Sequence, residues 1–380
     1  MERLLFGLYI HIPFCDVKCS YCDFYSLPRR HVDNLFWQKY LSRLKEDLEQ
    51  KYSYLDKGYR LGSIFFGGGT PSKAPLWFYE QILSHILEKF HLRRRKKLEI
   101  SIEVNPESFS TEKARAWAQL GINRINFGIQ SRDPSLLRYL GRLYHREKYQ
   151  KVVSQALKLG FPCVGVDLIY GIPGQRWRIL RDDLTWALNE GVHHISLYAL
   201  TIEPHTRLSH EINLGLKKKG CERRQVFHYQ KARQFLLDHG FLHYEVSNYC
   251  RPGYFCLHNL LYWKYRPYMG LGVSAHSFMK NLRFEECRSL EKYLAGTPPK
   301  IKEADPRLEY FIGASRISNP QSLHRYRRLL PQNIKLLQKK LGQLELENKV
   351  SILTGDRFAF RDEALLFSDS LAFELASLEC

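Results

Sequence analysis

The stretch that decides the fold runs from Leu8 to Phe24 and reads Leu8-Tyr-Ile-His-Ile-Pro-Phe-Cys-Asp-Val-Lys-Cys-Ser-Tyr-Cys-Asp-Phe24. Its largely apolar first five residues predict a strand. Three cysteines follow in C-x3-C-x2-C spacing, at Cys15, Cys19 and Cys22. A tight loop of this kind can supply three thiolates to a cubane iron–sulfur cluster, whose fourth iron is then left without a protein ligand. Because substrates and cofactors bind at open metal positions, the stretch predicts chemistry as well as structure.

A zinc site is the alternative interpretation of clustered cysteines. Structural zinc takes four ligands, usually from two C-x2-C pairs. The remaining cysteines are scattered and offer no second pair of this kind: Cys163, Cys221, Cys250, Cys256, Cys287 and Cys380. The odd total of nine cysteines also argues against a disulfide framework. The ligand count therefore favours an iron–sulfur cluster over zinc.

Composition sets the class of protein. The chain has 380 residues, enough for a large core and a smaller appended domain. Its formal charge of +19 favours anionic partners, but no finger, aromatic RNA-binding signature or regular basic stripe accompanies the charge, so we expect no nucleic-acid partner. The densest basic run, 93–97, is expected to be a solvated loop.

The same composition bears on location. No apolar run approaches the roughly 18 residues of a membrane span, so none is expected. The apolar start has no small-residue cleavage site and leads directly into the cysteine loop, which argues against a signal peptide. We therefore expect a cytoplasmic protein.

Short β-rich runs alternate with helical patterns over the first two-thirds of the chain. Strands are expected at 8–12, 63–66, 99–104, 124–128, 164–170 and 194–200, and helices near 33–50, 76–90, 111–120, 146–159, 176–190 and 222–239. Six β/α repeats predict an α/β fold with a parallel sheet and right-handed crossovers. An open doubly wound sheet and an incomplete barrel both satisfy this pattern.

The end of the chain has a different pattern. Helical stretches near 306–316 and 333–347, strand candidates at 350–353 and 357–361, and a last helix predict a small α+β domain of winged-helix type. Gly296-Thr-Pro-Pro299 marks a break before it. We therefore expect a site-bearing domain with a β extension over 1–285, a linker over 286–305 and a C-terminal domain over 306–380.

Polar or glycine-rich sequence follows five successive strands. These segments are the cysteine loop, Gly67-Gly-Gly-Thr-Pro71, Glu103-Val-Asn-Pro106, Gln130-Ser131 and Gly171-Ile-Pro-Gly174. Because ligands bind at the carboxyl ends of parallel strands, we expect one shared site there. The glycine triplet lets the backbone approach a ligand closely, and Glu103 is placed to accept hydrogen bonds from ribose hydroxyls or a ligand amine.

Further motifs resemble a known family. Gly121-Ile-Asn-Arg-Ile-Asn-Phe-Gly-Ile-Gln-Ser131, Leu140-Gly-Arg142, Val166-Asp-Leu-Ile-Tyr-Gly-Ile-Pro-Gly174 and Leu197-Tyr-Ala-Leu-Thr-Ile-Glu-Pro204 are similar to segments of the coproporphyrinogen dehydrogenase branch of radical S-adenosylmethionine (SAM) proteins. The resemblance runs in order over about residues 8–280. It implies an incomplete (β/α)6 radical SAM barrel. It also implies a [4Fe-4S] cluster that chelates SAM through its open iron, and an electron donor such as flavodoxin or ferredoxin.

The resemblance assigns roles by position. It implies that Cys15, Cys19 and Cys22 bind the cluster. Tyr9, Gly68 and Glu103 fall where the family holds the SAM on the cluster. A larger set falls where the dehydrogenases hold a second SAM, namely Tyr21, Gly69, Thr70, Gln130, Arg142 and Asp167.

Three features are nearer to the haem-chaperone (HemW) branch than to the dehydrogenases. Only fourteen residues precede Cys15, and Phe24 stands where the dehydrogenases have a fourth cysteine. His258-Asn-Leu-Leu-Tyr-Trp263 matches the H-N-x-x-Y-W signature of the chaperone branch. The match implies haem contacts by His258, Asn259, Tyr262 and Trp263, with a neutral imidazole as iron ligand and aromatic rings stacked on the macrocycle. No C-x-x-C-H motif for covalent haem is present.

The resemblance therefore implies a haem chaperone that binds haem, a [4Fe-4S] cluster and SAM and passes haem to an acceptor protein. The alternative is an oxygen-independent coproporphyrinogen III dehydrogenase, which removes hydrogen and CO2 from two propionates of its substrate. A radical methyltransferase that opens haem is a third class. Without the resemblance, a histidine beside packed aromatic residues favours a core role for His258.

Overall fold

The computed structural model describes residues 4–29, 31–56, 58–92, 98–329, 334–354, 356–361 and 364–377. The basic run at 93–97, expected to be a solvated loop, lies outside the described residues. Across the described ranges, no helix is both long and apolar enough to cross a bilayer.

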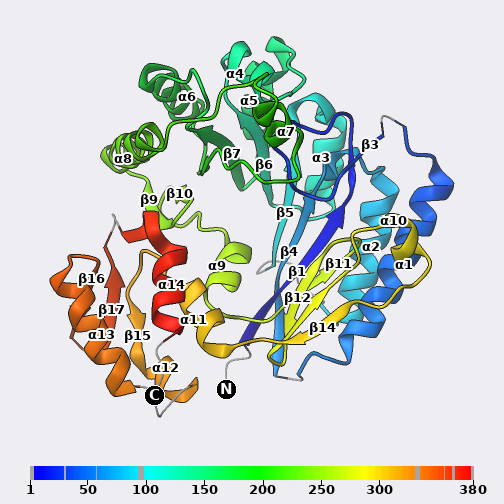
Figure 1. The fold of residues 1–380 in the computed structure, drawn as a ribbon. Coiled ribbons are helices and arrows are strands. Elements are labelled where there is room, and N and C mark those ends of the chain that lie inside the picture. Colours follow the sequence, from blue (N-terminus) through cyan, green and yellow to red (C-terminus); the bar gives the residue numbers. More distant parts are fainter. Residues whose placement is uncertain are drawn as a thin grey trace.

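A twelve-stranded sheet organises most of the chain, in the order β14-β13-β12-β11-β1-β4-β5-β6-β7-β8-β10-β9 (Figure 1). Its six central strands pair in parallel and lie in sequence order. They are β1 (Leu4–Ile12), β4 (Tyr59–Gly68), β5 (Glu99–Val104), β6 (Arg124–Gln130), β7 (Cys163–Tyr170) and β8 (His194–Ala199). A doubly wound sheet would reverse its strand order at a switch point. The unbroken order, with the strands curving around the centre, is that of an incomplete (β/α)6 barrel.

The connecting helices lie on the outside of this curve (Figure 1). They are α1 (Asn34–Tyr52), α2 (Leu76–Lys89), α3 (Thr111–Gln119), α5 (Arg146–Lys158) and α6 (Trp177–Glu190). The strand residues that share the main hydrophobic core are apolar and fully buried, including Ile64, Ile102, Phe127 and Val166. Their chain neighbours on the concave face are often polar, including Glu103, Asn126, Asp167 and Ser196. This alternation gives the barrel a polar interior that can hold a ligand.

Other elements complete the two ends of the barrel. A short parallel pair, β2 (Phe14–Cys15) and β3 (Leu27–Pro28), fixes the ends of the cysteine loop. The turns after β4 and β5 contain η1 (Pro71–Lys73) and η2 (Pro106–Ser108). Then come α4 (Pro134–Tyr139), α7 (Arg207–Asn213), α8 (Glu222–Asp238), β9 (Leu242–Glu245), β10 (Asn248–Cys250) and α9 (Leu257–Trp263). Helix α9 packs against β1 and β4.

The segment 286–305, expected to be a linker, belongs to the sheet domain. It contains α10 (Leu290–Leu294) and β14 (Lys300–Glu303), which follow β11 (Tyr268–Leu271), β12 (His276–Met279) and β13 (Leu282–Glu285). Strand β14 pairs antiparallel with β13. Tyr293 is fully buried, and its hydroxyl donates to Asp47 Oδ2 over 3.0 Å. The glycine and prolines at 296–299 therefore mark a turn inside the domain.

The C-terminal domain has its own hydrophobic core. It contains α11 (Pro306–Ala314), β15 (Gln321–Ser322), α12 (Leu323–Leu329), α13 (Ile334–Leu346), β16 (Val350–Leu353), β17 (Arg357–Phe360), η4 (Ala364–Phe367) and α14 (Ser368–Ala376). A three-stranded sheet in the order β15-β17-β16 packs with these helices, in keeping with the expected α+β domain. This domain, orange to red in Figure 1, contacts α9 through α11. The approach is close, because a Cβ at Gly313 would lie 2.1 Å from the carbonyl oxygen of Trp263.

Candidate functional site

A cavity of about 490 Å³ opens at the carboxyl ends of the barrel strands. Its volume suits one small organic ligand. Most of the site residues expected from the sequence line this cavity: Cys15, Cys19, Tyr21, Cys22, Gly68, Gly69, Thr70, Glu103, Gln130, Arg142 and Asp167. The fold therefore brings segments far apart in the sequence to one place.

The cysteine loop is anchored on both of its sides. On one side the hydroxyl of Thr70 donates to Cys15 Sγ over 3.3 Å. On the other side Arg142 Nη1 donates to Cys19 Sγ over 3.8 Å. Burial raises the pKa of the Cys15 thiol, and it raises the pKa of Cys22 to about 11. Without a metal the buried thiols are therefore neutral, and metal binding would deprotonate them.

The arrangement of the three thiols fits a [4Fe-4S] cluster. All three belong to one loop, face one cavity and are outside any disulfide. Within the described ranges, no three histidine, cysteine or carboxylate side chains converge as ligands of a single metal ion. In a cubane each thiolate binds a different iron, so these three cysteines would leave the fourth iron without a protein ligand.

The glycine triplet is required by packing against β1 and β2. Gly68 has a φ of 111°, and a Cβ there would lie 2.7 Å from the His11 imidazole. A Cβ at Gly69 would lie 2.9 Å from the carbonyl oxygen of Phe14. These contacts with the chain itself explain the glycines at both positions. Both residues also line the cavity. Close approach of their backbone to a ligand stays a prediction.

Two carboxyl groups, Glu103 and Asp167, line the cavity and lie near enough for their charges to interact. Burial, reinforced by the charge of Asp167, raises the pKa of Glu103 to about 8. Burial raises the pKa of Asp167 to about 6, although hydrogen bonds from Ser196 and Asn126 oppose the shift. The Asn126 amide donates to Asp167 Oδ1 over 2.5 Å. A cationic ligand would favour the ionised form of both groups.

A further polar group that lines the cavity is the side-chain amide of Gln130. Gln130 is buried with a φ of 66°, and its Oε1 has no hydrogen-bond partner among the described residues. An unpaired buried acceptor is costly unless a ligand donates to it. SAM carries an ammonium group, a sulfonium and hydroxyl donors, so the two carboxyls and this amide oxygen fit its chemistry.

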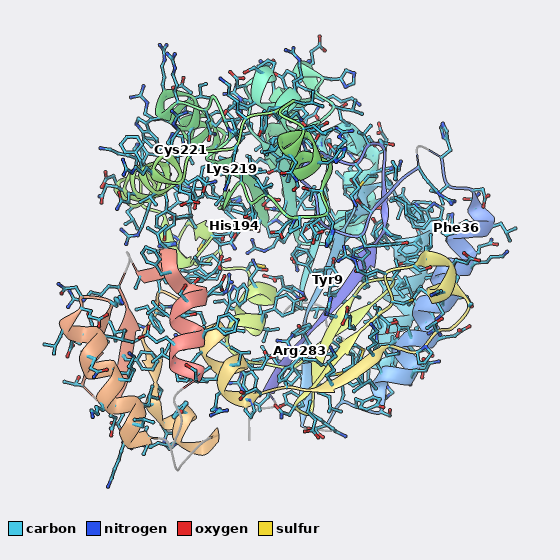
Figure 2. All side chains as sticks on the ribbon, viewed as in Figure 1. Tyr9, Phe36, His194, Lys219, Cys221 and Arg283 are labelled. Atoms are coloured by element: carbon cyan, nitrogen blue, oxygen red, sulfur yellow. The ribbon has the colours of Figure 1, made fainter. Side chains whose placement is uncertain are left out.

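Tyr9 lies behind this lining and is not part of it. It sits near the centre of the molecule (Figure 2), and its hydroxyl is 3.1 Å from His11 Nδ1. A Cβ at Gly67 would lie 2.8 Å from the Tyr9 ring, so this ring packs closely against the end of β4. Direct contact between Tyr9 and SAM therefore stays a prediction.

The structure does not bring His258 to the cavity. Its side chain is fully buried, with Nδ1 2.8 Å from the hydroxyl of Ser63 and Nε2 2.7 Å from the hydroxyl of Tyr262. Burial lowers its pKa to about 3, so the ring is neutral. Both ring nitrogens are engaged in this conformation, and ligation of haem iron by the neutral imidazole of His258 stays a prediction.

The rest of the segment His258–Trp263 also has packing contacts. The Glu99 carboxylate accepts from the backbone N–H groups of Leu257 (3.0 Å) and His258 (2.9 Å), which caps α9. The Arg316 guanidinium lies 4.9 Å from the centre of the Trp263 ring. Asn259, Tyr262 and Trp263 are partly exposed, and the cavity lining does not include them. Haem contact by these residues stays a prediction.

Two residues of the site were missed in the sequence. Tyr198 lines the cavity, and Asn126 holds the carboxylate of Asp167. Both lie at alternate positions of their strands, on the face opposite to the buried apolar residues. Polar residues with a period of two in parallel strands are the signal that would have revealed them.

Comparisons with known proteins agree with this geometry. A family model described as Radical SAM superfamily matches residues 9–187. The chain is 35% identical over 286 residues to the heme chaperone HemW of Synechocystis sp., covering 75% of this chain and 69% of that protein. It is 30% identical to the heme chaperone HemW of Mycobacterium tuberculosis, covering 96% of this chain and 93% of that protein.

A solved structure shows the same fold. The coproporphyrinogen III oxidase HemN of Escherichia coli, a radical SAM enzyme, superposes with a TM-score of 0.82 at 19% identity. The match covers 99% of this chain and 91% of that chain. At this identity the likeness establishes the barrel and its C-terminal domain as a shared architecture.

Proposed function

This chain belongs to the family of the heme chaperone HemW, within the radical SAM superfamily, and we propose that it binds haem and passes it to an acceptor protein. The observation that carries the proposal is the similarity to heme chaperones over nearly the whole length of the chain. Phe24 supports it, since this side chain is exposed at the cavity beside Cys22 where a dehydrogenase-like loop has a fourth cysteine. We place this activity in the cytoplasm.

Two resident groups belong to the proposal. Cys15, Cys19 and Cys22 would hold a [4Fe-4S] cluster, which when bound supplies an open iron and exchanges single electrons. Glu103, Gln130 and Asp167 would contact SAM in the adjoining cavity. The Glu103 carboxylate accepts from the backbone N–H of Gly68 over 3.3 Å, which orients it. A small electron-transfer protein of the flavodoxin or ferredoxin kind would reduce the cluster.

A dehydrogenase acting on coproporphyrinogen III is the second candidate. The observation that favours it is the fold, which matches the coproporphyrinogen III oxidase HemN over almost the whole chain. The raised pKa of Glu103 and Asp167 is compatible with either function, since both proposals place SAM beside these carboxyls.

One experiment separates the two functions. The protein is reconstituted anaerobically with iron and sulfide and given haem or coproporphyrinogen III, each with SAM and reductant. A haem chaperone should bind about one haem per chain, seen as a shifted Soret band, and should release it to a haem-free acceptor such as apomyoglobin. It should leave coproporphyrinogen III unchanged. Turnover of coproporphyrinogen III without haem binding would establish the dehydrogenase.

Two variants test the expected haem contact at His258. Tyr262→Phe removes the partner of Nε2 and keeps the ring, whereas His258→Ala removes the imidazole. If α9 opens to present His258 to haem, Tyr262→Phe should bind haem more tightly and His258→Ala should lose the Soret shift. Unchanged haem binding in both variants would place haem elsewhere on the chain.

A further inference from the structure

Two side chains donate hydrogen bonds to the expected cluster sulfurs from opposite sides of the loop. The Thr70 hydroxyl reaches Cys15 Sγ over 3.3 Å, and Arg142 Nη1 reaches Cys19 Sγ over 3.8 Å. Thr70 follows the end of β4, and Arg142 lies in the loop between α4 and α5, so folding of the barrel sets their positions.

Arg142 is fixed at three points. Its Nη2 donates to the carbonyl oxygen of Gly128 over 2.6 Å, and its Nε donates to the Tyr149 hydroxyl over 3.3 Å. Tyr149 is itself 1% exposed and donates to the carbonyl oxygen of Leu143. The guanidinium therefore connects β6, α5 and the cysteine loop. Its bonds to Gly128 and Tyr149 hold it in place beside Cys19.

Thr70 is held as firmly. It is buried, and it follows Gly69, whose backbone N–H donates to the carbonyl oxygen of Ile12 over 2.8 Å. The hydroxyl hydrogen is thereby directed at Cys15 from the turn before η1. Thr70 supplies a neutral hydrogen bond, whereas Arg142 supplies a hydrogen bond and a permanent positive charge.

These donors bear on the electron affinity of a cluster bound at the three thiols. Reduction adds one negative charge to a group that already carries three thiolates. Hydrogen bonds to the sulfurs and a fixed neighbouring cation stabilise the reduced state more than the oxidised state. Arg142 and Asp167 line the same cavity, and the charge of Arg142 partly offsets the burial that raises the pKa of Asp167, so this cation acts on both the loop and the cavity.

We propose that Arg142 and Thr70 are positioning residues that raise the reduction potential of the cluster through Cys19 and Cys15. The inference rests on the proposed cluster site. It gives these two residues a role toward the sulfurs, in addition to the SAM contact that the family resemblance implies. The larger share belongs to Arg142, because it alone brings charge.

The test is an anaerobic redox titration of the reconstituted protein without SAM, followed by the EPR signal of the reduced cluster. Arg142→Gln should move the midpoint to a more negative potential, and Arg142→Lys, which keeps the charge, should move it less. Thr70→Val should shift the midpoint in the same direction by a smaller amount. Thr70→Ser, which keeps the hydroxyl, should restore the wild-type value.

A matched control separates this effect from general damage. Arg124 is a buried arginine at the opposite end of β6, where it pairs with Glu99 at 3.3 Å, and Arg124→Gln should leave the midpoint unchanged. Iron content and circular dichroism of each variant are compared with the wild type. Unchanged midpoints in cluster-loaded Arg142→Gln and Thr70→Val would overturn the inference and leave the proposed cluster intact. Failure of the wild-type protein to take up a cluster would instead overturn the proposed function.

Discussion

At the amino ends of the barrel strands, Glu99, Arg124 and Cys256 form a closed network, whereas at the carboxyl ends Glu103, Arg142 and Cys19 surround a cavity. In the closed network the guanidinium of Arg124 donates to the carbonyl oxygens of Tyr254 and Phe255, each over 2.7 Å. The carboxylate of Glu99 caps α9 and pairs with Arg124. The same three residue types therefore occur at both ends of one sheet.

The difference lies in what the polar groups have as partners. At the closed end, protein atoms occupy the hydrogen-bonding positions of Glu99 and Arg124, so the charges stabilise the fold. At the open end, Gln130 Oε1 is unpaired within the described residues and two carboxyls have raised pKa values. Unpaired buried polar groups cost stability, and they persist where a ligand completes them.

The largest expected effect of this contrast concerns the cysteines. Cys19→Ala should abolish the visible charge-transfer absorption of the reconstituted protein, because a cubane bound by two thiolates is poorly held. Cys256→Ala, at the closed end, should keep about four iron and four sulfide per chain. Normal iron content in Cys19→Ala would break the contrast between the two ends.

The next effect concerns the closed end. His258→Ala should lower the free energy of unfolding by about 2–4 kcal/mol, because it removes a buried ring and leaves the hydroxyls of Ser63 and Tyr262 unpaired. Urea denaturation of the apoprotein measures the change. His31→Ala, at an exposed position, is the control and should change stability by no more than about 0.5 kcal/mol. Equal effects of the two substitutions would show that the buried side chain of His258 contributes no stability.

The smallest expected effect is a pH dependence at the open end. The pKa of Glu103 is about 8 in the fold against an unfolded value of 4.5, so the folded state binds more protons between these values. Stability should therefore fall as pH rises from about 5 to 8. Glu103→Gln should weaken this dependence and gain on the order of 2 kcal/mol at pH 8. Thermal unfolding of apoprotein across this range checks the sign, and a variant that loses stability at pH 8 would contradict it.

Much of this contrast could be predicted from the sequence. Runs rich in β-branched, aliphatic and aromatic residues, alternating with helical patterns, located the six barrel strands to within a few residues, because the helices outside the sheet require an apolar strand face. The strand-end rule then brought the cysteines, Glu103 and Gln130 together, and the family resemblance added Asp167. The sequence could not show that Tyr9 stands behind the cavity lining, since that depends on the close packing of β1 against the Gly67 turn.

Three features could be established only from the structure: the contacts of His258, the place of segment 286–305 in the sheet domain, and the packing around Gly68 and Gly69. The role of His258 depends on partners almost 200 positions away in the chain, since Ser63 is 195 residues earlier. The linker expectation rested on glycine and proline at 296–299, which mark a turn equally well within a domain. The packing reason for Gly68 and Gly69 depends on His11 and Phe14, which approach only after the strands pair.

The close contact between Gly313 and Trp263 has a consequence for synthesis of the protein. Every barrel strand and α9 have left the ribosome before the last fifth of the sequence, 306–380, is made. Until α11 emerges, the surface of α9 that it covers stays open to water and to other chains. During this interval of synthesis, the surface of α9 on the nascent barrel is exposed to solvent. A chain that stalls within residues 306–380 would be a target for aggregation and degradation.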